Sequence, residues 1–316
     1  MAEIAAVIPC YKVTDQVLDV LAAIPDCFTR IYCVDDDCPD HSGDLIEKEN
    51  RDPRVVVLRN DRNLGVGGAV KHGYRKALEE GAEIILKIDG DGQMDPRLAH
   101  KFIEPILSGR ADYTKGNRFF DPHNIKDMPA IRLFGNAILS FMNKFSSGYW
   151  HVFDPNNGYT AIHAKVLRLL PLDKLSDRYF FETDMLFRLN TVRAMVQDIP
   201  MDAVYGDEIS NLNIRKVIGS FFGGHIRNFG KRVLYNYFLR DFHAASAQLV
   251  LGLLLFPFGV AYGTIHWIEA LATGQLTPTG IIMVAALPII IGVQMLLSVL
   301  QFDVENTPKT VIHPLL

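Results

Sequence analysis

The sequence has few cysteines, no excess of basic charge and no basic leader, and each absence excludes a class of protein. The four cysteines form no paired C-x-x-C motif, so we expect reduced thiols in a reducing compartment and no zinc site. The net charge of −4 argues against general nucleic-acid binding. The first residues, Met1-Ala2-Glu3-Ile4, lack the basic region of a signal peptide, which predicts a cytoplasmic amino-terminal domain.

Charged residues are missing from two long stretches near the end of the chain, 244–261 and 279–301. Because about 20 helical residues cross a hydrocarbon core, each stretch is long enough to span a bilayer. The connection 266–279 has no Lys or Arg, whereas basic residues precede the first stretch and Lys309 follows the second. The positive-inside rule therefore predicts a hairpin with both ends in the cytoplasm. The alternative is a buried helical pair in a soluble protein.

The segment before the first apolar stretch has apolar residues at helical spacing and basic residues on the opposite arc. The apolar positions are Ile214, Val217, Ile218, Phe221, Phe222, Phe229 and Val233. This pattern predicts one or two helices lying in the membrane interface, with a break near Gly219, Gly223 and Gly224. The alternative is an ordinary amphipathic helix packed on the domain.

Strand-like runs alternate with helix-compatible stretches before residue 120. The runs are Ile4–Ile8, Ile31–Val34, Val55–Leu58 and Ile84–Ile88, and the stretches between them include 16–23 and 67–80. This alternation predicts a mostly parallel sheet with helical crossovers. The carboxyl ends of such strands meet at one edge, where open α/β sheets bind their ligands.

The motif Asp89-Gly90-Asp91-Gly92-Gln93 follows the fourth run directly. Carboxylates beside glycine suit a divalent cation that carries phosphates, although an isolated D-x-D is also typical of an acidic turn. Pro9-Cys10-Tyr11 and Asp35-Asp36-Asp37 should reach the same edge. The segment 63–69 opens a helix with a glycine-rich turn, whose N–H groups can approach a phosphate or a ribose. No G-x-G-x-x-G follows the first strand, which argues against a dinucleotide-binding oxidoreductase.

Five motifs occur in the order seen in family 2 glycosyltransferases of the GT-A fold. They are V-I-P-C-Y from Val7, Val34-Asp35-Asp36, N-x-G-x-G-x-A from Asn63, D-G-D-G-Q-x-D-P from Asp89, and Gly116-Asn117-Arg118. More narrowly, the chain resembles the polyprenyl-phosphate glycosyltransferases, which are the dolichyl-phosphate mannose synthase group and its bacterial undecaprenyl-phosphate relatives. One departure is Asp37-Cys38-Pro39, where the family commonly has Gly-Ser-Thr.

The resemblance implies a Rossmann-like GT-A domain with a mostly parallel sheet, followed by a membrane-bound part. We expect the glycosyltransferase domain at 1–212 and amphipathic juxtamembrane helices at 213–243. Two transmembrane helices should then occupy 244–302, and a cytoplasmic tail 303–316.

On the donor side, the resemblance implies a nucleotide-diphosphate sugar held with Mg²⁺ or Mn²⁺. Asp89 and Asp91 match the metal-binding positions, and Gln93 is a candidate for a further ligand or for a residue that supports the ligands. The candidate nucleotide-sugar contacts are Pro9, Tyr11, Asp36, Asn63, Gly67, Asp89, Glu182 and Asp184. The acids Glu182 and Asp184 are equally typical of a helix N-terminus, where negative charge is stabilising.

On the acceptor side, Arg118 and Arg132 match family positions that hold a lipid phosphate. Asp154 is a candidate for assisting acceptor activation or for holding the loop on the metal side. A guanidinium can bind two phosphate oxygens at once. Either arginine is alternatively a surface residue. We count Asp91, Asp154, Arg118 and Arg132 as the candidate catalytic group.

The resulting hypothesis is an inverting, metal-dependent hexose transfer from a UDP-glucose or GDP-mannose type of donor to a polyprenyl phosphate. The enzyme would be a two-span protein of the cytoplasmic membrane, in contact with lipids and not with nucleic acid; a homo-oligomer is left open. Alternatives are a membrane glycosyltransferase with a polysaccharide or glycolipid acceptor, and a non-catalytic nucleotide-sugar-binding subunit. The absence of Q-x-x-R-W argues against a processive synthase.

Overall fold

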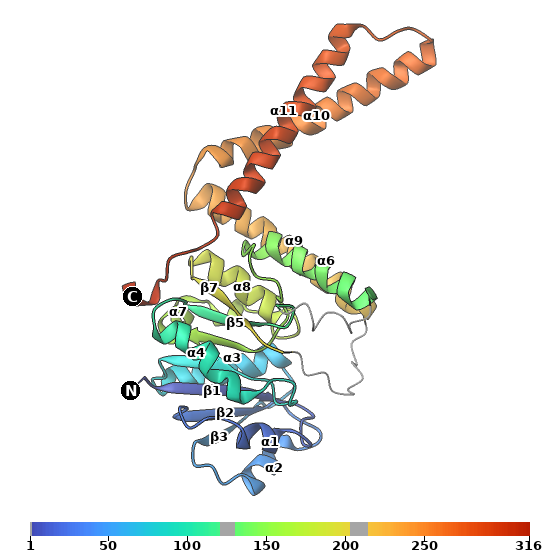
Figure 1. Cartoon of the computed structure of the whole chain (residues 1–316). Coiled ribbons are helices and arrows are strands. Elements are labelled where there is room, and N and C mark those ends of the chain that lie inside the picture. The colour runs from blue at the N-terminus through green and yellow to red at the C-terminus, as the bar shows by residue number, and fades with distance from the viewer. Residues whose placement is uncertain (1, 121–129, 203–213) are drawn as a thin grey trace. The chain divides into compact units, whose positions relative to one another are not determined.

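The computed structural model describes residues 2–120, 130–202 and 214–316, without the side chains of 130–133, 214–218 and 220. The chain forms two compact units, of which one is an α/β domain and the other is helical (Figure 1). The first unit contains Met1–Phe229 and Pro308–Leu316, and the second contains Gly230–Thr307. The chain therefore leaves the first unit and returns to it for its last residues.

Within the described part of the first unit, seven strands form one sheet in the order β3-β2-β1-β4-β6-β5-β7. The strands are β1 (Ile4–Cys10), β2 (Arg30–Asp35), β3 (Val55–Arg59), β4 (Ile84–Lys87), β5 (Tyr113–Asn117), β6 (Thr160–His163) and β7 (Val196–Pro200). β6 runs antiparallel to its neighbours β4 and β5, and the other pairs are parallel. The four predicted strand runs form β1 to β4, so the mostly parallel sheet is confirmed.

Helices cover both faces of this sheet (Figure 1). They are α1 (Val17–Ala22), α2 (Ser42–Glu49), α3 (Val66–Glu79), α4 (Ala99–Leu107), α7 (Ala164–Leu169) and α8 (Phe181–Thr191), with 3₁₀ turns at Pro96–Leu98, Leu172–Lys174 and His313–Leu315. A further helix, α6 (Ala130–Ser147), packs against α8. Successive side chains of a strand point to opposite faces. In β1, Ile4, Ala6 and Ile8 join a core with α1, α2 and α4, whereas Ala5 and Val7 join a core with α3, α7 and α8.

The predicted break in the juxtamembrane segment is wrong, because α9 (Ile214–Leu234) is one continuous helix followed by a π-helical turn (Tyr235–Leu239). Gly224 serves close packing: a Cβ there would lie 2.7 Å from the Phe180 ring. A Cβ at Gly219 or Gly223 would have no such neighbour within 4 Å. The helical propensity cost of glycine, about 1 kcal/mol each, is offset by packing of the helix on the domain.

One side of α9 packs on the first unit. Phe221 and His225 meet the Phe180 ring edge-on, with ring centroids 5.3 and 5.2 Å apart. Asn228 donates a hydrogen bond from Nδ2 to Asp184 Oδ1 at 3.0 Å. These three α9 residues are spaced i, i+4 and i+7, which places them on one helix face.

The carboxy-terminal tail docks on a buried carboxylate of the first unit. Asp112, which precedes β5, is 0% exposed. Its Oδ1 accepts hydrogen bonds from the backbone N–H groups of Ile312 at 3.0 Å and His313 at 2.8 Å, and its Oδ2 accepts from Met195 N at 2.7 Å. The His313 ring stacks on His163 with centroids 4.2 Å apart. The last residues thus complete the interior at the start of β5.

The second unit contains two long helices packed against each other. They are α10 (Ala244–Thr273) and α11 (Thr279–Glu305), both longer than the uncharged stretches that predicted them. A Cβ at Gly259 would lie 2.7 Å from Ala285 O, and one at Gly292 would lie 2.7 Å from Phe256 N, so glycines let the two backbones approach closely. Both helices are long and apolar enough to cross a membrane.

We predict that stability falls as the pH drops from about 6.5 towards 4, in part through His225. This side chain is 4% exposed, and burial lowers the pKa of His225 to about 4. Its Nδ1 lies 2.7 Å from Ser146 Oγ. The unfolded state takes up a proton below pH ~6.5 while the folded state does not, so stability present above that pH is lost on acidification.

The measurement is thermal unfolding of the detergent-solubilised protein between pH 8 and pH 4.5, with His225→Asn beside the wild type. The variant should be less stable than the wild type at high pH and lose less stability on acidification. Parallel pH curves for the two proteins would contradict the assignment of this pH dependence to His225.

Candidate functional site

Several of the predicted site residues lie at the carboxyl edge of the sheet. Asp36 directly follows β2, Asp89 follows β4 and Arg118 follows β5. Because β6 runs antiparallel to β4 and β5, the loop 154–158 that precedes it reaches the same edge. Motifs that are far apart in the sequence therefore meet in one place, as expected for a sheet of this kind.

Lys87, the last residue of β4, is a buried lysine that joins three parts of this edge. Its side chain is 1% exposed, and its Nζ donates to Asp89 Oδ1 at 2.7 Å, to Gly158 O at 3.2 Å and to Glu182 Oε1 at 3.2 Å. Burial alone would lower the pKa of Lys87, but the charges of Asp89 and Glu182 outweigh it and raise this pKa. The ammonium group therefore stays charged and holds these three parts together.

A row of polar residues crosses the sheet beside Lys87. Lys87 of β4 and Lys115 of β5 both pair with Thr160 of β6, so the three side chains share one face of the sheet. Lys115 is fully buried and donates a hydrogen bond from Nζ to the carbonyl oxygen of Asn157. Burial lowers the pKa of Lys115 to about 8. Both lysines thus hold the backbone of the loop that leads into β6.

The same loop carries Asp154, which orients Arg118. Arg118 donates from Nε to Asp154 Oδ2 at 2.7 Å and from Nη2 to Asp154 Oδ1 at 3.0 Å. Asp154 is 2% exposed, whereas the Arg118 side chain is 31% exposed. The pair is bidentate, which fixes the plane of the guanidinium. Two residues that the sequence placed in separate motifs therefore act as one structural unit.

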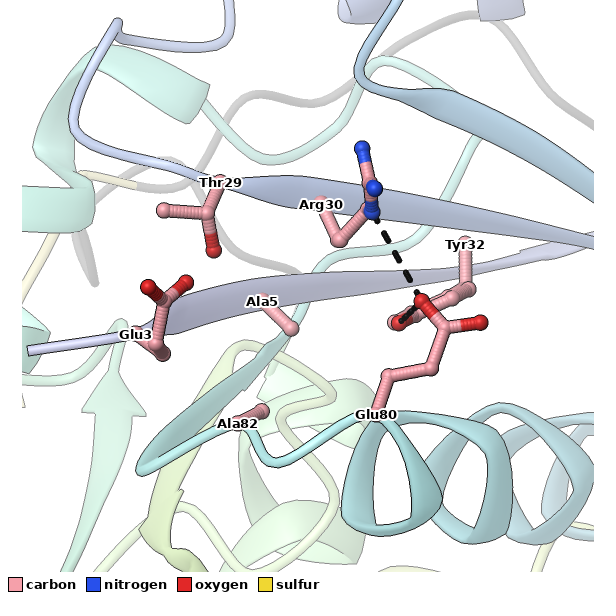
Figure 2. Close-up of a pocket in the computed structure, with 7 residues that line it drawn as sticks. All are labelled: Glu3, Ala5, Thr29, Arg30, Tyr32, Glu80 and Ala82. Atoms are coloured by element: carbon pink, nitrogen blue, oxygen red, sulfur yellow. Dashed lines mark hydrogen bonds and ion pairs between the residues drawn. The ribbon is translucent and has the colours of Figure 1, made fainter.

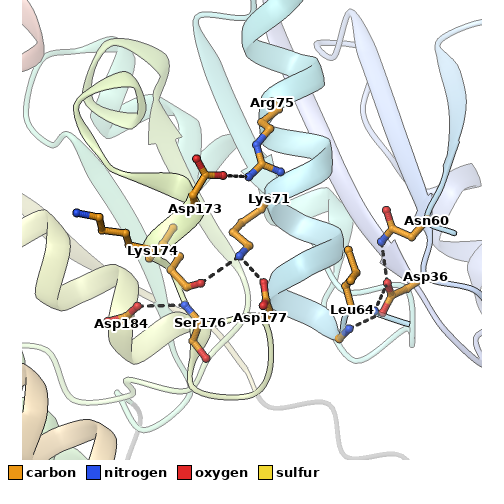
Figure 3. Close-up of polar contacts among 12 residues, drawn as sticks. Asp36, Asn60, Leu64, Lys71, Arg75, Asp173, Lys174, Ser176, Asp177 and Asp184 are labelled. Atoms are coloured by element: carbon orange, nitrogen blue, oxygen red, sulfur yellow. Dashed lines mark hydrogen bonds and ion pairs between the residues drawn. The ribbon is translucent and has the colours of Figure 1, made fainter. Parts of the chain in front are cut away.

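Asp36 holds the glycine-rich turn in place (Figure 3). Its Oδ1 accepts hydrogen bonds from Asn60 Nδ2 at 2.7 Å and Leu64 N at 2.9 Å, and its Oδ2 accepts from Gly65 N at 2.7 Å. Gly65 has φ 84°, in the left-handed region that favours glycine. Asp36 is 2% exposed, so its visible role is to shape this turn; a contact with a nucleobase stays a prediction.

The loop that leads into α8 packs on the glycine-rich turn. A Cβ at Gly67 would lie 2.3 Å from Ser176 O, so a larger residue would push the two segments apart. Lys71 of α3 is 6% exposed and donates from Nζ to Leu175 O at 3.0 Å and to the carboxylate of Asp177 (Figure 3). This loop is therefore anchored to the helix that the glycine-rich turn opens.

The two acids in the first turn of α8 have different surroundings. Glu182 contacts Lys87 and belongs to the edge described above. Asp184 is 0% exposed, and its carboxylate accepts hydrogen bonds from Ser176 N at 3.1 Å and Asn228 Nδ2 at 3.0 Å. Asp184 therefore fastens α8 to its neighbours in the interior, and its contact with a donor sugar stays a prediction.

The D-x-D motif offers an incomplete cation site. Asp89 and Asp91 are both partly exposed, and Asp91 Oδ1 accepts a hydrogen bond from Gln93 N at 3.0 Å. In the described ranges, no three His, Cys, Asp or Glu side chains are arranged to hold a metal ion. Two carboxylates suit a Mg²⁺ or Mn²⁺ ion whose other ligands are phosphate oxygens and water. The residues therefore fit a cation that binds together with a nucleotide diphosphate.

The remaining predicted residues are placed as follows. Pro9 and Asn63 are partly buried, and Tyr11 is exposed after the end of β1. Arg132 falls within the range of α6, but its side chain lies outside the described residues. Asp37, which stands where the family commonly has glycine, has φ 54°, a left-handed conformation that Asp tolerates better than most residues.

A cavity of about 450 Å³ lies at the amino ends of β1 and β2 (Figure 2). It is lined by Glu3, Ala5, Thr29, Arg30, Tyr32, Glu80 and Ala82. Tyr32 donates from its hydroxyl to Glu80 Oε2 at 2.8 Å across it. This cavity is at the opposite end of the strands from the D-x-D motif, so it plays no part in the site.

Sequence reasoning missed the residues that support the site from below. In the sequence Lys87 lies within an apolar strand run, and no motif points to Lys115 or Asn157. A signal was present for Lys87, because a lysine in an otherwise apolar, buried strand requires a charged partner. No pattern in the sequence indicates which carbonyl oxygens the two lysines reach.

The sequence model of the family described as "Glycosyl transferase family 2" matches residues 5–170. An undecaprenyl-phosphate mannosyltransferase of Micrococcus luteus is 27% identical over 64% of this chain and 83% of its own length. A UDP-N-acetylglucosamine–dolichyl-phosphate N-acetylglucosaminyltransferase of Methanococcus voltae is 32% identical over 48% of this chain and 60% of its own length.

Solved structures show the same fold. Mannosyl-3-phosphoglycerate synthase of Rubrobacter xylanophilus aligns with a TM-score of 0.57 and 17% identity over 77% of each chain. Glucosyl-3-phosphoglycerate synthase of Mycobacterium tuberculosis, in a complex with Mn²⁺ and UDP, aligns with a TM-score of 0.54 and 15% identity over 73% of this chain and 80% of that one. The GT-A architecture expected from the sequence is thus confirmed. With the family match over more than half of its length, the chain belongs to glycosyl transferase family 2 and is a glycosyltransferase.

Proposed function

We propose that this protein transfers a hexose, with inversion, from a nucleotide-diphosphate sugar to a polyprenyl phosphate at the cytoplasmic face of a membrane. The observation that carries the proposal is one edge of the sheet. There the D-x-D acids and the Arg118–Asp154 pair are linked through Lys87 and the loop 154–158. Two relatives whose names specify polyprenyl-phosphate acceptors support the acceptor class.

Asp89 and Asp91 would hold the divalent cation, with Gln93 as a further candidate. When bound, such a cation neutralises the diphosphate and favours its departure from the sugar. The chain's own contribution is to fix the two carboxylates at the end of β4, because Lys87 orients Asp89. The turn shaped by Asp36 gives the donor a rigid wall on the side of α3.

Donor and acceptor both carry negative charge, so the acceptor needs a cation beside it. A phosphate monoester has its second pKa near ~6 and is already largely ionised at neutral pH, which makes a general base less necessary. Arg118 would bind the acceptor phosphate, in a plane that Asp154 sets. Asp154 is then a positioning residue for Arg118. Arg132 is proposed as a second phosphate contact on the strength of the family resemblance.

Membrane attachment is supported by the exposed side of α9. Phe222, Ile226 and Phe229 are 55%, 55% and 41% exposed and lie at i, i+4 and i+7, beside the face that packs on the domain. An exposed apolar helix face next to basic residues is typical of a helix in the membrane interface. We therefore propose that α9 binds the domain with one side and lipid with the other.

The donor chemistry is tested with undecaprenyl phosphate and a panel of UDP- and GDP-sugars, following nucleotide release and lipid product together. One donor should give both products.

Asp91→Ala should lower turnover by about 10²-fold or more, because diphosphate charge is left uncompensated, and the fold should persist. Excess EDTA should reproduce the loss. Full activity in the variant or in EDTA would refute the metal assignment.

The acceptor site is tested with Arg118→Ala and Arg132→Ala. Each variant should lose about 10²-fold or more in lipid glycosylation, the scale of removing one transition-state contact. Donor binding, measured by titration calorimetry, should change little. Asp154→Asn should resemble Arg118→Ala, since it weakens the pair that orients the guanidinium. If donor affinity falls as much as turnover, the arginines contact the donor diphosphate instead.

Topology follows from chain connectivity. Residues before 230 and after 307 belong to one unit, so both ends of the helical hairpin should lie on the side of that unit. The test uses two variants that lack the four native cysteines. One carries Leu276→Cys in the α10–α11 connection, and the other carries Leu315→Cys in the tail. In intact cells an impermeant maleimide should label only the former. Labelling of both or neither would contradict a two-span hairpin with cytoplasmic ends.

A further inference from the structure

Lys87 places a fixed positive charge at the D-x-D motif, and this has a consequence for how a cation enters the proposed site. The Nζ of Lys87 lies 2.7 Å from Asp89 Oδ1, and the lysine side chain is 1% exposed. Asp89 itself is partly exposed, with 26% of its side chain accessible. The exposed carboxylate therefore already carries a cation on its buried side.

We propose that Lys87 is a built-in counter-ion that competes with the divalent metal for Asp89. The metal therefore binds only weakly when no donor is present, and it enters the site together with the donor diphosphate. The inference rests on the proposed function, since it assumes that Asp89 and Asp91 hold the metal. Lys87 acts through Asp89 and is a positioning residue.

The charge balance supports this order of binding. Three carboxylates, Asp89, Asp91 and Glu182, lie at or near the motif, and Lys87 pairs with two of them. A metal ion would approach Asp89 against the repulsion of an ammonium that is held in place and shielded from water, where charges interact strongly. The diphosphate of a donor adds negative charge and oxygen ligands, and these outweigh the repulsion.

A purely structural lysine would not need Asp89. Gly158 O and Glu182 already accept hydrogen bonds from the Lys87 ammonium group in the interior. Lys71 is a buried lysine of the same kind that lies away from the D-x-D motif. Its ammonium group contacts Leu175 O and one carboxylate, that of Asp177. Lys71 is therefore a matched control for the loss of a buried lysine.

The test measures Mn²⁺ binding to the full-length protein in detergent, by electron paramagnetic resonance of free Mn²⁺, with and without UDP or GDP. The double variant Lys87→Met/Glu182→Gln removes one charge of each sign and keeps the interior neutral. Without nucleotide it should bind Mn²⁺ at least about tenfold more tightly than the wild type, because the repulsion is gone. Nucleotide should raise its affinity less than it raises that of the wild type.

Two controls separate the causes. Lys71→Met should leave Mn²⁺ affinity unchanged, and Glu182→Gln alone should not increase it.

If the double variant does not fold, Gly158→Ala replaces it. A Cβ at Gly158 would lie 2.4 Å from both Lys87 Nζ and Asp89 Oδ2, so the methyl group must displace these side chains. By weakening the Lys87–Asp89 contact it should also tighten Mn²⁺ binding.

Unchanged or weaker Mn²⁺ binding in the folded variants, beside a wild type that binds Mn²⁺ with nucleotide, would overturn the role of Lys87 and leave the proposed function standing. A wild type that binds no Mn²⁺ even with its nucleotide, together with full activity of Asp91→Ala, would overturn the metal site and this inference with it.

Discussion

A single buried ammonium group, that of Lys87, sets the geometry on which the site depends. Taking a lysine out of water costs several kcal/mol unless it is paired, and here two carboxylates and one carbonyl oxygen compensate it. Its partners come from the end of β4, the loop before β6 and the first turn of α8. Since that loop also carries Asp154, which orients Arg118, the D-x-D motif and Arg118 are held in place by connected contacts.

Around this centre, glycine and buried acids determine how closely the surrounding segments approach. Gly67 admits the loop before α8, and Lys71 holds that loop from the helix below it. Asp36 shapes the glycine-rich turn before α3, and Asp184 links α8 to α9 by a hydrogen bond. Lys71, Asp36 and Asp184 are buried polar groups whose side chains are hydrogen-bonded, as is the rule for interior polar groups. The glycine-rich turn, the loop before α8 and the part of α9 that carries Asn228 therefore pack together.

The strands, their order of motifs and the edge that collects the acids were predictable from the sequence, because strand runs and turn residues are local signals. The Arg118–Asp154 pair and the interior position of Asp184 were not, since they join segments far apart in the chain. The sequence wrongly predicted a break in α9 near Gly224. The helix is continuous there because its contact with Phe180 outweighs the low helix propensity of glycine. Lys87 was visible as an anomaly in an apolar strand, but its partners depend on the fold.

The docking of the tail on Asp112 bears on how the protein is made. Two donors to this buried carboxylate, the backbone N–H groups of Ile312 and His313, follow α10 and α11 in the chain and leave the ribosome after them. Until then Asp112 has Met195 N as a donor but lacks the hydrogen bonds from Ile312 and His313, and β5, which ends beside Arg118, begins at an unfinished core. The interior of the catalytic domain is therefore completed only after residues 230–307 have been synthesised. If these residues form a membrane hairpin, they must also have been inserted.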